Sequence, residues 1–296
     1  MHEHVAALRR FNRSFTQRIG ALDESFLGSG RPLGPSRLLY EIGVDGIGVL
    51  ELRNRLGLDS GYVSRLLRQL EADGLVTVTA DPDDGRRRRA GLTRRGRVEW
   101  KRLDRRSDAL AERLVAPLSA RQRQQLTEAL GNADRLLRAA TITFDVVDPQ
   151  SADALWAMTE YFDELDRRFP TGFDPGETLV VDAASMRAPE GAFVVAHSDG
   201  DAVACGGVKR VDAATAEIKR MWVHRRLRGA GVGRRLLEHL EGVARGLGHT
   251  QVVLDTNATL LEAIAMYEQA GYSPTERYND NPYAARWFVK RLVPAK

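Results

Sequence analysis

The 296-residue sequence contains a single cysteine, Cys205. One cysteine excludes an intramolecular disulfide framework and a cysteine-rich zinc site, and no metal site is predicted. No apolar run approaches the roughly 18 residues that cross a bilayer, and residues 1–4 do not open a secretory signal. The Gly-Lys-Ser/Thr triplet of nucleoside-triphosphatase loops is also missing. These absences predict a cytoplasmic protein without a membrane partner.

Charge is unevenly distributed along the chain. Residues 1–150 hold 26 Lys and Arg against 20 Asp and Glu, a net charge of +6, whereas the remaining residues carry −2. The basic residues of the first half are concentrated between Arg86 and Arg106. A single core usually stops growing near about 250 residues, so the length predicts two domains. The charge asymmetry predicts different partners for the two halves.

Apolar spacing in the first half predicts a mainly helical domain. Gly57-Leu58-Asp59 joins two short helices, which is typical of a helix-turn-helix, and Ser60 is expected to cap the second of them. A hairpin with a basic tip follows, in which Arg86 to Arg89 begin the returning strand. The predicted helices cover residues 4–19, 36–42, 49–56, 60–73, 94–114 and 119–139, and the first hairpin strand covers 75–79.

A helix-turn-helix followed by a basic hairpin predicts a winged helix that binds DNA. The second helix would read base edges in the major groove, and the wing arginines suit phosphates or the minor groove. A run of arginines on a hairpin can also be a solvated surface, but its place beside the helix-turn-helix favours DNA. The candidate DNA-contacting residues are Ser60, Tyr62, Ser64, Arg65, Arg68, Arg86, Arg87 and Arg88.

Three segments, 66–76 (LLRQLEADGLV), 81–86 (DPDDGR) and 92–96 (LTRRG), resemble the MarR family of transcription regulators. The resemblance covers residues 1–142, and Arg86 matches the family's wing arginine. It implies a homodimer built by the first and last helices that binds palindromic double-stranded DNA. The apolar residues of helix 119–139 would supply that interface or, alternatively, belong to the core.

Residues 143–296 predict an α+β domain with a mixed central sheet, because two paired strands precede alternating strands and helices. The predicted strands cover residues 144–149, 191–196, 202–210, 216–223, 251–255 and 286–292, and the predicted helices cover 152–168, 234–247 and 259–270. The whole chain is therefore expected to be multi-domain, with a winged helix-turn-helix domain before the α+β domain.

The stretch Arg228-Gly-Ala-Gly-Val-Gly233 lies between a predicted strand and a predicted helix. Glycines allow close approach of an anion, and the first N–H groups of the helix would point at it. A tight turn without a ligand is the alternative, but Arg228 and Arg234 favour an anion. The dinucleotide fingerprint fails because its third glycine position is occupied by Arg234.

The Arg-x-x-Gly-x-Gly signature at 228–233, with 221–223 before it and Asn257, Tyr267 and Gly271-Tyr272 after it, resembles the GNAT acetyltransferases over residues 144–293. The resemblance implies acetyl-CoA, with its pyrophosphate on the loop amides and its pantetheine along the preceding strand. The implied cofactor-binding residues are Met221, Trp222, Val223, Arg228, Gly229, Ala230, Gly231, Val232, Gly233, Arg234, Asn257 and Tyr267.

Amine acetylation also needs proton transfers. Tyr267 stands where the resemblance implies a proton donor for the departing thiolate, although a core aromatic residue is the alternative. Glu217 is the candidate base for the attacking amine, against the alternative of a surface glutamate. The candidate acceptor-binding residues are Tyr161, Arg168, Phe169 and Asn281. Acidic groups there would suit a cationic amine and Arg168 a carboxylate, which leaves the acceptor open.

The leading interpretation is a bifunctional chain: a DNA-binding transcription regulator joined to an acetyl-CoA-dependent N-acetyltransferase that acts on a small-molecule amine or a protein lysine. The alternative is a regulator whose second half senses acetyl-CoA or a metabolite without turnover. A third possibility is an enzyme whose first half only dimerises, against which the basic wing argues.

Overall fold

The computed structural model describes residues 1–82, 84–170, 172–174, 176 and 184–293. The chain forms two compact units, Met1–Ala129 and Leu130–Lys296. The division between the units falls inside helix α6 (Ala120–Ala140). The domain boundary predicted from the sequence, after residue 142, lies beyond the end of that helix. In the described residues, no helix is long and apolar enough to cross a membrane.

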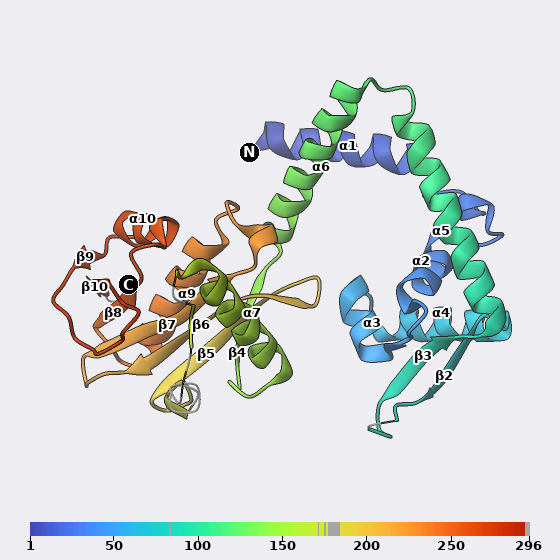
Figure 1. Ribbon diagram of the computed structural model, residues 1–296. Coiled ribbons are helices and arrows are strands. Elements are labelled where there is room, and N and C mark those ends of the chain that lie inside the picture. Colours follow the sequence, from blue (N-terminus) through green and yellow to red (C-terminus); the bar gives the residue numbers. More distant parts are fainter. Residues whose placement is uncertain (83, 171, 175, 177–183, 294–296) are drawn as a thin grey trace. The chain divides into compact units, whose positions relative to one another are not determined.

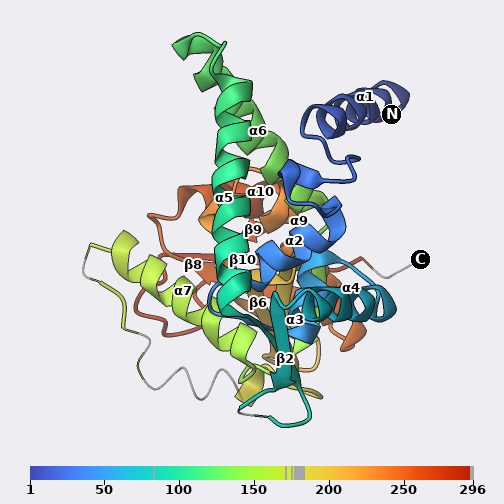
Figure 2. The same ribbon diagram turned by 90° about the vertical axis from the view of Figure 1, so that its right-hand side faces the viewer.

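The first unit is a winged helix. Its three strands pair in the antiparallel order β1-β3-β2, and α4 contacts the hairpin at β2 (Figures 1 and 2). Before α6, its elements are α1 (His2–Arg18), η1 (Phe26–Gly28), α2 (Leu33–Ile42), β1 (Ile47–Gly48), α3 (Val49–Leu56), α4 (Ser60–Ala72), β2 (Val76–Ala80), β3 (Arg88–Leu92) and α5 (Arg94–Val115).

Two local predictions in this unit are wrong. Asp59, not Ser60, caps α4: its carboxylate accepts a hydrogen bond from the Tyr62 N–H at 2.8 Å, and Ser60 is already the first helical residue. Arg86 and Arg87 belong to the turn rather than to the returning strand. Hydrogen bonds from Asp81 N to Arg87 O and from Arg87 N to Asp84 O close that turn, so the strand begins at Arg88.

The Leu-Thr-x-x-Gly segment positions α5 against the rest of the winged helix. The Thr93 hydroxyl oxygen accepts a hydrogen bond from Gly96 N at 2.9 Å and thereby caps the helix. The same hydroxyl donates to Gly74 O at 2.7 Å. A Cβ added to Gly96 would stand 1.9 Å from Leu75 O, so glycine is what lets the helix lie directly on the chain before β2.

The second unit is built on a seven-stranded sheet in the order β4-β5-β6-β7-β8-β10-β9. β7 and β8 are parallel and the other neighbours are antiparallel, which confirms the mixed sheet. Its elements are β4 (Thr143–Val147), α7 (Ala152–Arg168), β5 (Gly191–Ser198), β6 (Asp201–Arg210), β7 (Thr215–Val223), η2 (Arg225–Leu227), α9 (Val232–Gly246), β8 (Gln251–Thr256), α10 (Leu261–Gln269), β9 (Ser273–Pro274) and β10 (Arg286–Arg291).

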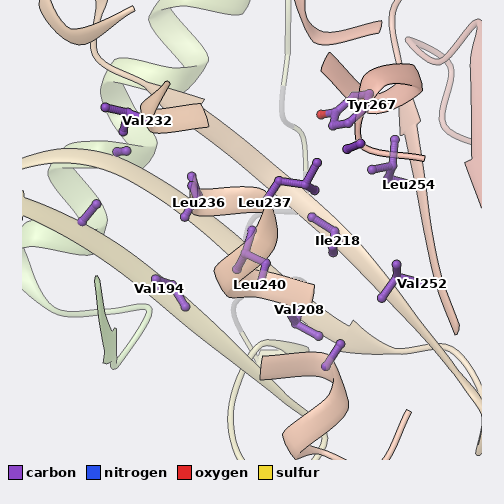
Figure 3. Close-up of a cluster of buried hydrophobic side chains, with 14 of the residues drawn as sticks. Val194, Val208, Ile218, Val232, Leu236, Leu237, Leu240, Val252, Leu254 and Tyr267 are labelled. Carbon is purple, nitrogen blue, oxygen red and sulfur yellow. The ribbon is translucent and has the colours of Figure 1, made fainter. Parts of the chain in front are cut away.

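Helices cover both faces of this sheet (Figure 1). Successive strand residues point to opposite faces, so Val194 packs with Leu236 and Leu240 of α9, whereas its neighbours Phe193 and Val195 pack with α7. Figure 3 shows the α9 side, where leucines of that helix meet Ile218 of β7 and Tyr267 of α10. The two cores fix β7 between α7 and α9.

We predict that Gly96→Ala destabilises the first unit by roughly 1–3 kcal/mol, because the added methyl overlaps the Leu75 carbonyl. The measurement is differential scanning calorimetry of the full chain. Gly91→Ala is the matched control, since a Cβ there meets nothing within 4 Å. Equal unfolding temperatures for the two variants would show that α5 does not need glycine at this contact.

Candidate functional site

A cavity opens in the second unit where β7 and β8 separate. The two strands pair only between Thr215–Glu217 and Gln251–Val253. Beyond that point residues of both strands line a cavity of ≈ 780 Å³. Its wall also includes residues of α7, α10 and the loop before β10: Tyr161, Leu165, Ala263, Tyr267, Asn279, Asp280, Asn281, Pro282 and Tyr283.

Glu217, the last residue of β7 that pairs with β8, lines the cavity and is 3% exposed. Its carboxylate is paired with the Lys209 ammonium at 3.0 Å and, more loosely, with that of Lys219 at 3.7 Å. It also accepts hydrogen bonds from the Tyr278 hydroxyl at 3.0 Å and from Asn279 Nδ2 at 3.1 Å. The charge of Glu217 is therefore neutralised, and its oxygens are held by four donors.

Asp255 of β8 also lines the cavity, and its carboxylate is partly buried. Sequence analysis did not assign this residue to the site. It accepts hydrogen bonds from Nδ2 of Asn281 and, at 3.2 Å, from Nδ2 of Asn279. Trp287 Nε1–H donates to Asn279 Oδ1 at 3.1 Å, which turns that amide nitrogen toward both carboxylates. Burial raises the pKa of Asp255 above its ordinary value, against the opposing attraction of Lys219.

Tyr267 of α10 reaches the cavity from the α9 side of the sheet. The ring is 7% exposed and packs against Tyr272 and Phe288. Burial, reinforced by the nearby Tyr161 and Asp255, raises the pKa of Tyr267, so its hydroxyl keeps its proton at neutral pH. No described residue hydrogen-bonds with this hydroxyl. It is therefore available as a donor to a bound molecule.

The part of the wall formed by residues that follow α7 and by the loop before β10 is aromatic. The Phe173 ring lies 5.9 Å from Phe169 and 4.7 Å from Tyr283, between centroids, and it stacks on Phe162 at 5.5 Å. The Tyr283 hydroxyl accepts a hydrogen bond from Asp174 N at 3.0 Å. These contacts join the end of α7 to the loop before β10 and give the cavity an apolar side.

The glycine loop between η2 and α9 has the geometry of an anion site. Gly231 adopts a left-handed conformation, φ 78°, and precedes the first helical residue. The backbone N–H groups of residues 231–234 donate to no carbonyl in the described chain, as expected for a helix start. The flanking arginines are engaged elsewhere: Arg228 with Glu164 and the Val223 carbonyl, and Arg234 with Glu238 and the Gln269 carbonyl.

The predicted site residues divide into two groups. The residues that line the cavity are Tyr161, Phe169, Glu217, Met221, Asn257, Tyr267 and Asn281. The residues outside its wall are Arg168, Trp222, Val223 and the loop from Arg228 to Arg234.

Contacts explain several of these placements. Trp222 points to the α7 face, where it is 5% exposed and donates to Glu164 at 3.0 Å, and Arg168 pairs with Glu164 and Glu262. Asn257 Nδ2 donates to the Tyr283 carbonyl at 2.8 Å, so that amide holds the loop before β10. Asp255, Lys219 and Phe173 are site residues that sequence analysis did not single out, whereas Asn279 and Tyr283 belong to the same loop as the predicted Asn281.

The first unit presents its predicted DNA-contacting residues on one helix and one turn. Ser64, Arg65 and Arg68 are exposed on α4, opposite the buried Val63, Leu66 and Leu67, and Arg65 lies over the Tyr62 ring at 5.2 Å. Arg86, Arg87 and Arg88 are exposed at the hairpin, where Arg87 pairs with Asp84 at 3.2 Å. These side chains are exposed to solvent, where a phosphate backbone can reach them.

Three or more His, Cys, Asp or Glu side chains do not gather into a metal-holding group anywhere in the part of the chain that the structure describes.

Two family models match the chain. The Acetyltransferase (GNAT) family matches residues 158–272, which include the cavity residues of β7, β8 and α10 and the glycine loop. The MarR family matches residues 29–87, which include α4 and the start of the wing. The two resemblances noted in the sequence are thereby confirmed.

Individual relatives match one half or the other. The IAA acetyltransferase of Azospirillum brasilense is 31% identical over 130 residues, which are 43% of this chain and 85% of that relative. The uncharacterized HTH-type transcriptional regulator YdgJ of Bacillus subtilis (strain 168) is 31% identical over 93 residues, 31% of this chain and 56% of that protein. The crystal structure of an acetyltransferase from Streptococcus agalactiae 2603 matches with a TM-score of 0.45 at 21% identity, over 51% of this chain and 98% of that one.

Asp255 provides a stability test of the cavity. Because its pKa is raised in the folded chain, the ionised side chain lowers stability above the ordinary aspartate pKa, about 3.9, and that cost disappears below it. We predict that Asp255→Asn raises the unfolding temperature of the second unit at pH 7.5 and that the gain shrinks toward pH 4. Calorimetry across this range measures it; a variant less stable than the parent at pH 7.5 contradicts the burial argument.

Proposed function

The chain belongs to the acetyltransferase (GNAT) family and carries a MarR-family module in its first half, and we propose that it binds double-stranded DNA and transfers an acetyl group from acetyl-CoA to an amine. The observation that carries the enzymatic part is the cavity between β7 and β8, which Tyr267 lines. The Tyr267 hydroxyl has no hydrogen-bond partner among the described residues, so it is available as a proton donor.

The residues of the second unit fit acetyl-CoA. The free N–H groups of residues 231–234 suit its pyrophosphate. Past Glu217, the described part of β7 does not pair with β8, so backbone groups near Met221 can bind an extended chain. A Cβ at Gly233 would stand 3.2 Å from Met266 Sδ, a tight contact that would require the methionine side chain to shift. When bound, acetyl-CoA supplies an activated acetyl thioester for attack by an amine.

The chain's own groups supply the proton transfers. Tyr267 is held protonated by burial and is suited to give its proton to a departing thiolate. A backbone N–H near Met221 or Val223 is suited to stabilise an oxyanion. Glu217 or Asp255 would take a proton from the amine, and Glu217 is the more constrained of the two because two lysines and two further donors already hold it.

DNA binding rests on α4 and the wing, and dimerisation on two apolar helix faces. α1 buries no residue within the described chain, and it exposes Val5, Leu8, Phe11 and Phe15. α6 exposes Leu126, Leu130, Leu136 and Leu137. Apolar stripes of this size on two helices fit a homodimer in which a second copy of the chain covers them.

We predict that Tyr267→Phe lowers kcat for acetyl transfer by about 10²-fold while the KM for acetyl-CoA changes little, because only proton donation is lost. The measurement is CoA release with a panel of amines. Tyr272→Phe is the matched control: the same atom is removed from a neighbouring buried tyrosine that does not line the cavity. Acetyl-CoA binding with no turnover for any amine would instead favour the sensor function.

We predict that the full chain binds a mixed-sequence 30-base-pair duplex with a steep salt dependence, and that Arg86→Ala/Arg88→Ala lowers the slope of log K against log salt by about 1 for each lost phosphate contact. Fluorescence anisotropy between 50 and 200 mM salt, roughly the range over which such slopes are measured, checks this. Arg121→Ala removes an exposed arginine of α6 and serves as control. Equal slopes for both variants would remove the wing from the interface.

A further inference from the structure

The cavity contains a partly buried carboxylate, Asp255, that forms no ion pair in the described chain, although the ammonium of Lys219 attracts it from a longer distance. The described chain places no Lys or Arg within ion-pairing distance of Asp255, which is held only by amide donors. A carboxylate withdrawn from water without a cation costs free energy, and the raised pKa of Asp255 reflects that cost. Binding of a cation at Asp255 would relieve the cost, so this end of the cavity favours a positively charged group.

The cations of the wall have partners already. Lys209 and Lys219 both face Glu217. Arg220 lies over the Phe162 ring, with its guanidinium carbon 5.0 Å from the centroid, and makes further interactions. A carboxylate on a bound molecule would therefore have to displace an existing contact while facing Asp255.

The remaining wall suits an apolar ring. Phe169, Phe173 and Tyr283 form one aromatic surface of the cavity, and the hydrogen bond from Asp174 N holds the Tyr283 hydroxyl in place. Aromatic side chains fixed in this way offer a preformed surface for a flat apolar body. The same cavity thus joins a site for a cation to a site for a ring.

We propose that the acceptor is a primary amine carried on an aromatic or similarly bulky apolar body without a carboxylate beside the amine, with Asp255 binding the ammonium and the Phe169, Phe173 and Tyr283 surface binding the body. This assignment rests on the proposed acetyl transfer and narrows its substrate. It makes Asp255 a residue that determines specificity by charge and Phe173 one that determines it by shape.

L-Phenylalaninol and L-phenylalanine test the charge requirement, because they share the ring and the branched carbon and have amines of similar basicity. With the full chain, kcat/KM for phenylalaninol is expected to exceed that for phenylalanine by at least about tenfold, since the carboxylate faces Asp255. Asp255→Asn should lower kcat/KM for phenylalaninol by about tenfold or more and bring the ratio of the two substrates toward unity.

2-Phenylethylamine and ethanolamine test the apolar requirement. The ring-bearing amine is expected to be the better substrate by about tenfold or more, because its body buries apolar area against the aromatic wall. Phe173→Leu, which keeps an apolar side chain, should reduce this preference. The parent chain's own substrate ratios decide the question if the variants are unstable.

The outcomes separate the assignment from the proposed function. Equal or better use of phenylalanine than of phenylalaninol, or of ethanolamine than of 2-phenylethylamine, overturns the assignment. If no amine is acetylated although acetyl-CoA binds, the proposed transfer fails, and calorimetric binding of the same amines in the presence of CoA decides the assignment. Tighter binding of phenylalaninol than of phenylalanine then supports it, and the reverse order overturns it.

Discussion

The separation of β7 from β8 is the constraint on which the second unit depends. Parallel pairing ends after Glu217, so the backbone of the later part of β7 and the side chains at the end of β8 face a cavity rather than each other. The strands can part because α7 packs on one face of the sheet and α9 and α10 on the other. Those packed helices hold the opening in place without strand-to-strand hydrogen bonds.

The positively charged partners in this cavity are divided unequally between two of its carboxylates, Glu217 and Asp255. Glu217 is buried with two lysines, which makes it part of the framework, whereas Asp255 has only amide donors. Asn279 touches both carboxylates and is oriented by Trp287, so the loop before β10 connects them. A partly buried carboxylate without an ion pair is costly to keep in a folded chain, which is why we assign Asp255 to ligand recognition.

The first unit also combines side chains held in fixed contacts with side chains left exposed at its surface. Thr93 and Gly96 fix α5 against the strand before the wing, and the buried stripe of α4 leaves its arginines exposed. In contrast, no residue of α1 is buried within the described chain. A helix with an uncovered apolar face is a poor element for an isolated domain, so this part of the chain suits association with a second copy.

The sequence by itself determined the elements and the families, because apolar periodicity, Gly231 and Gly233 and the Leu-Thr-x-x-Gly segment act over short distances along the chain. The two residues that it predicted as catalytic, Tyr267 and Glu217, both line the cavity. Tertiary structure alone decided that Trp222 faces away from the cavity and that Asp255 forms no ion pair in the described chain. Each depends on which side chains meet across the fold, and residues 24 or more positions apart, such as Asp255 and Asn279, leave no local pattern of their meeting.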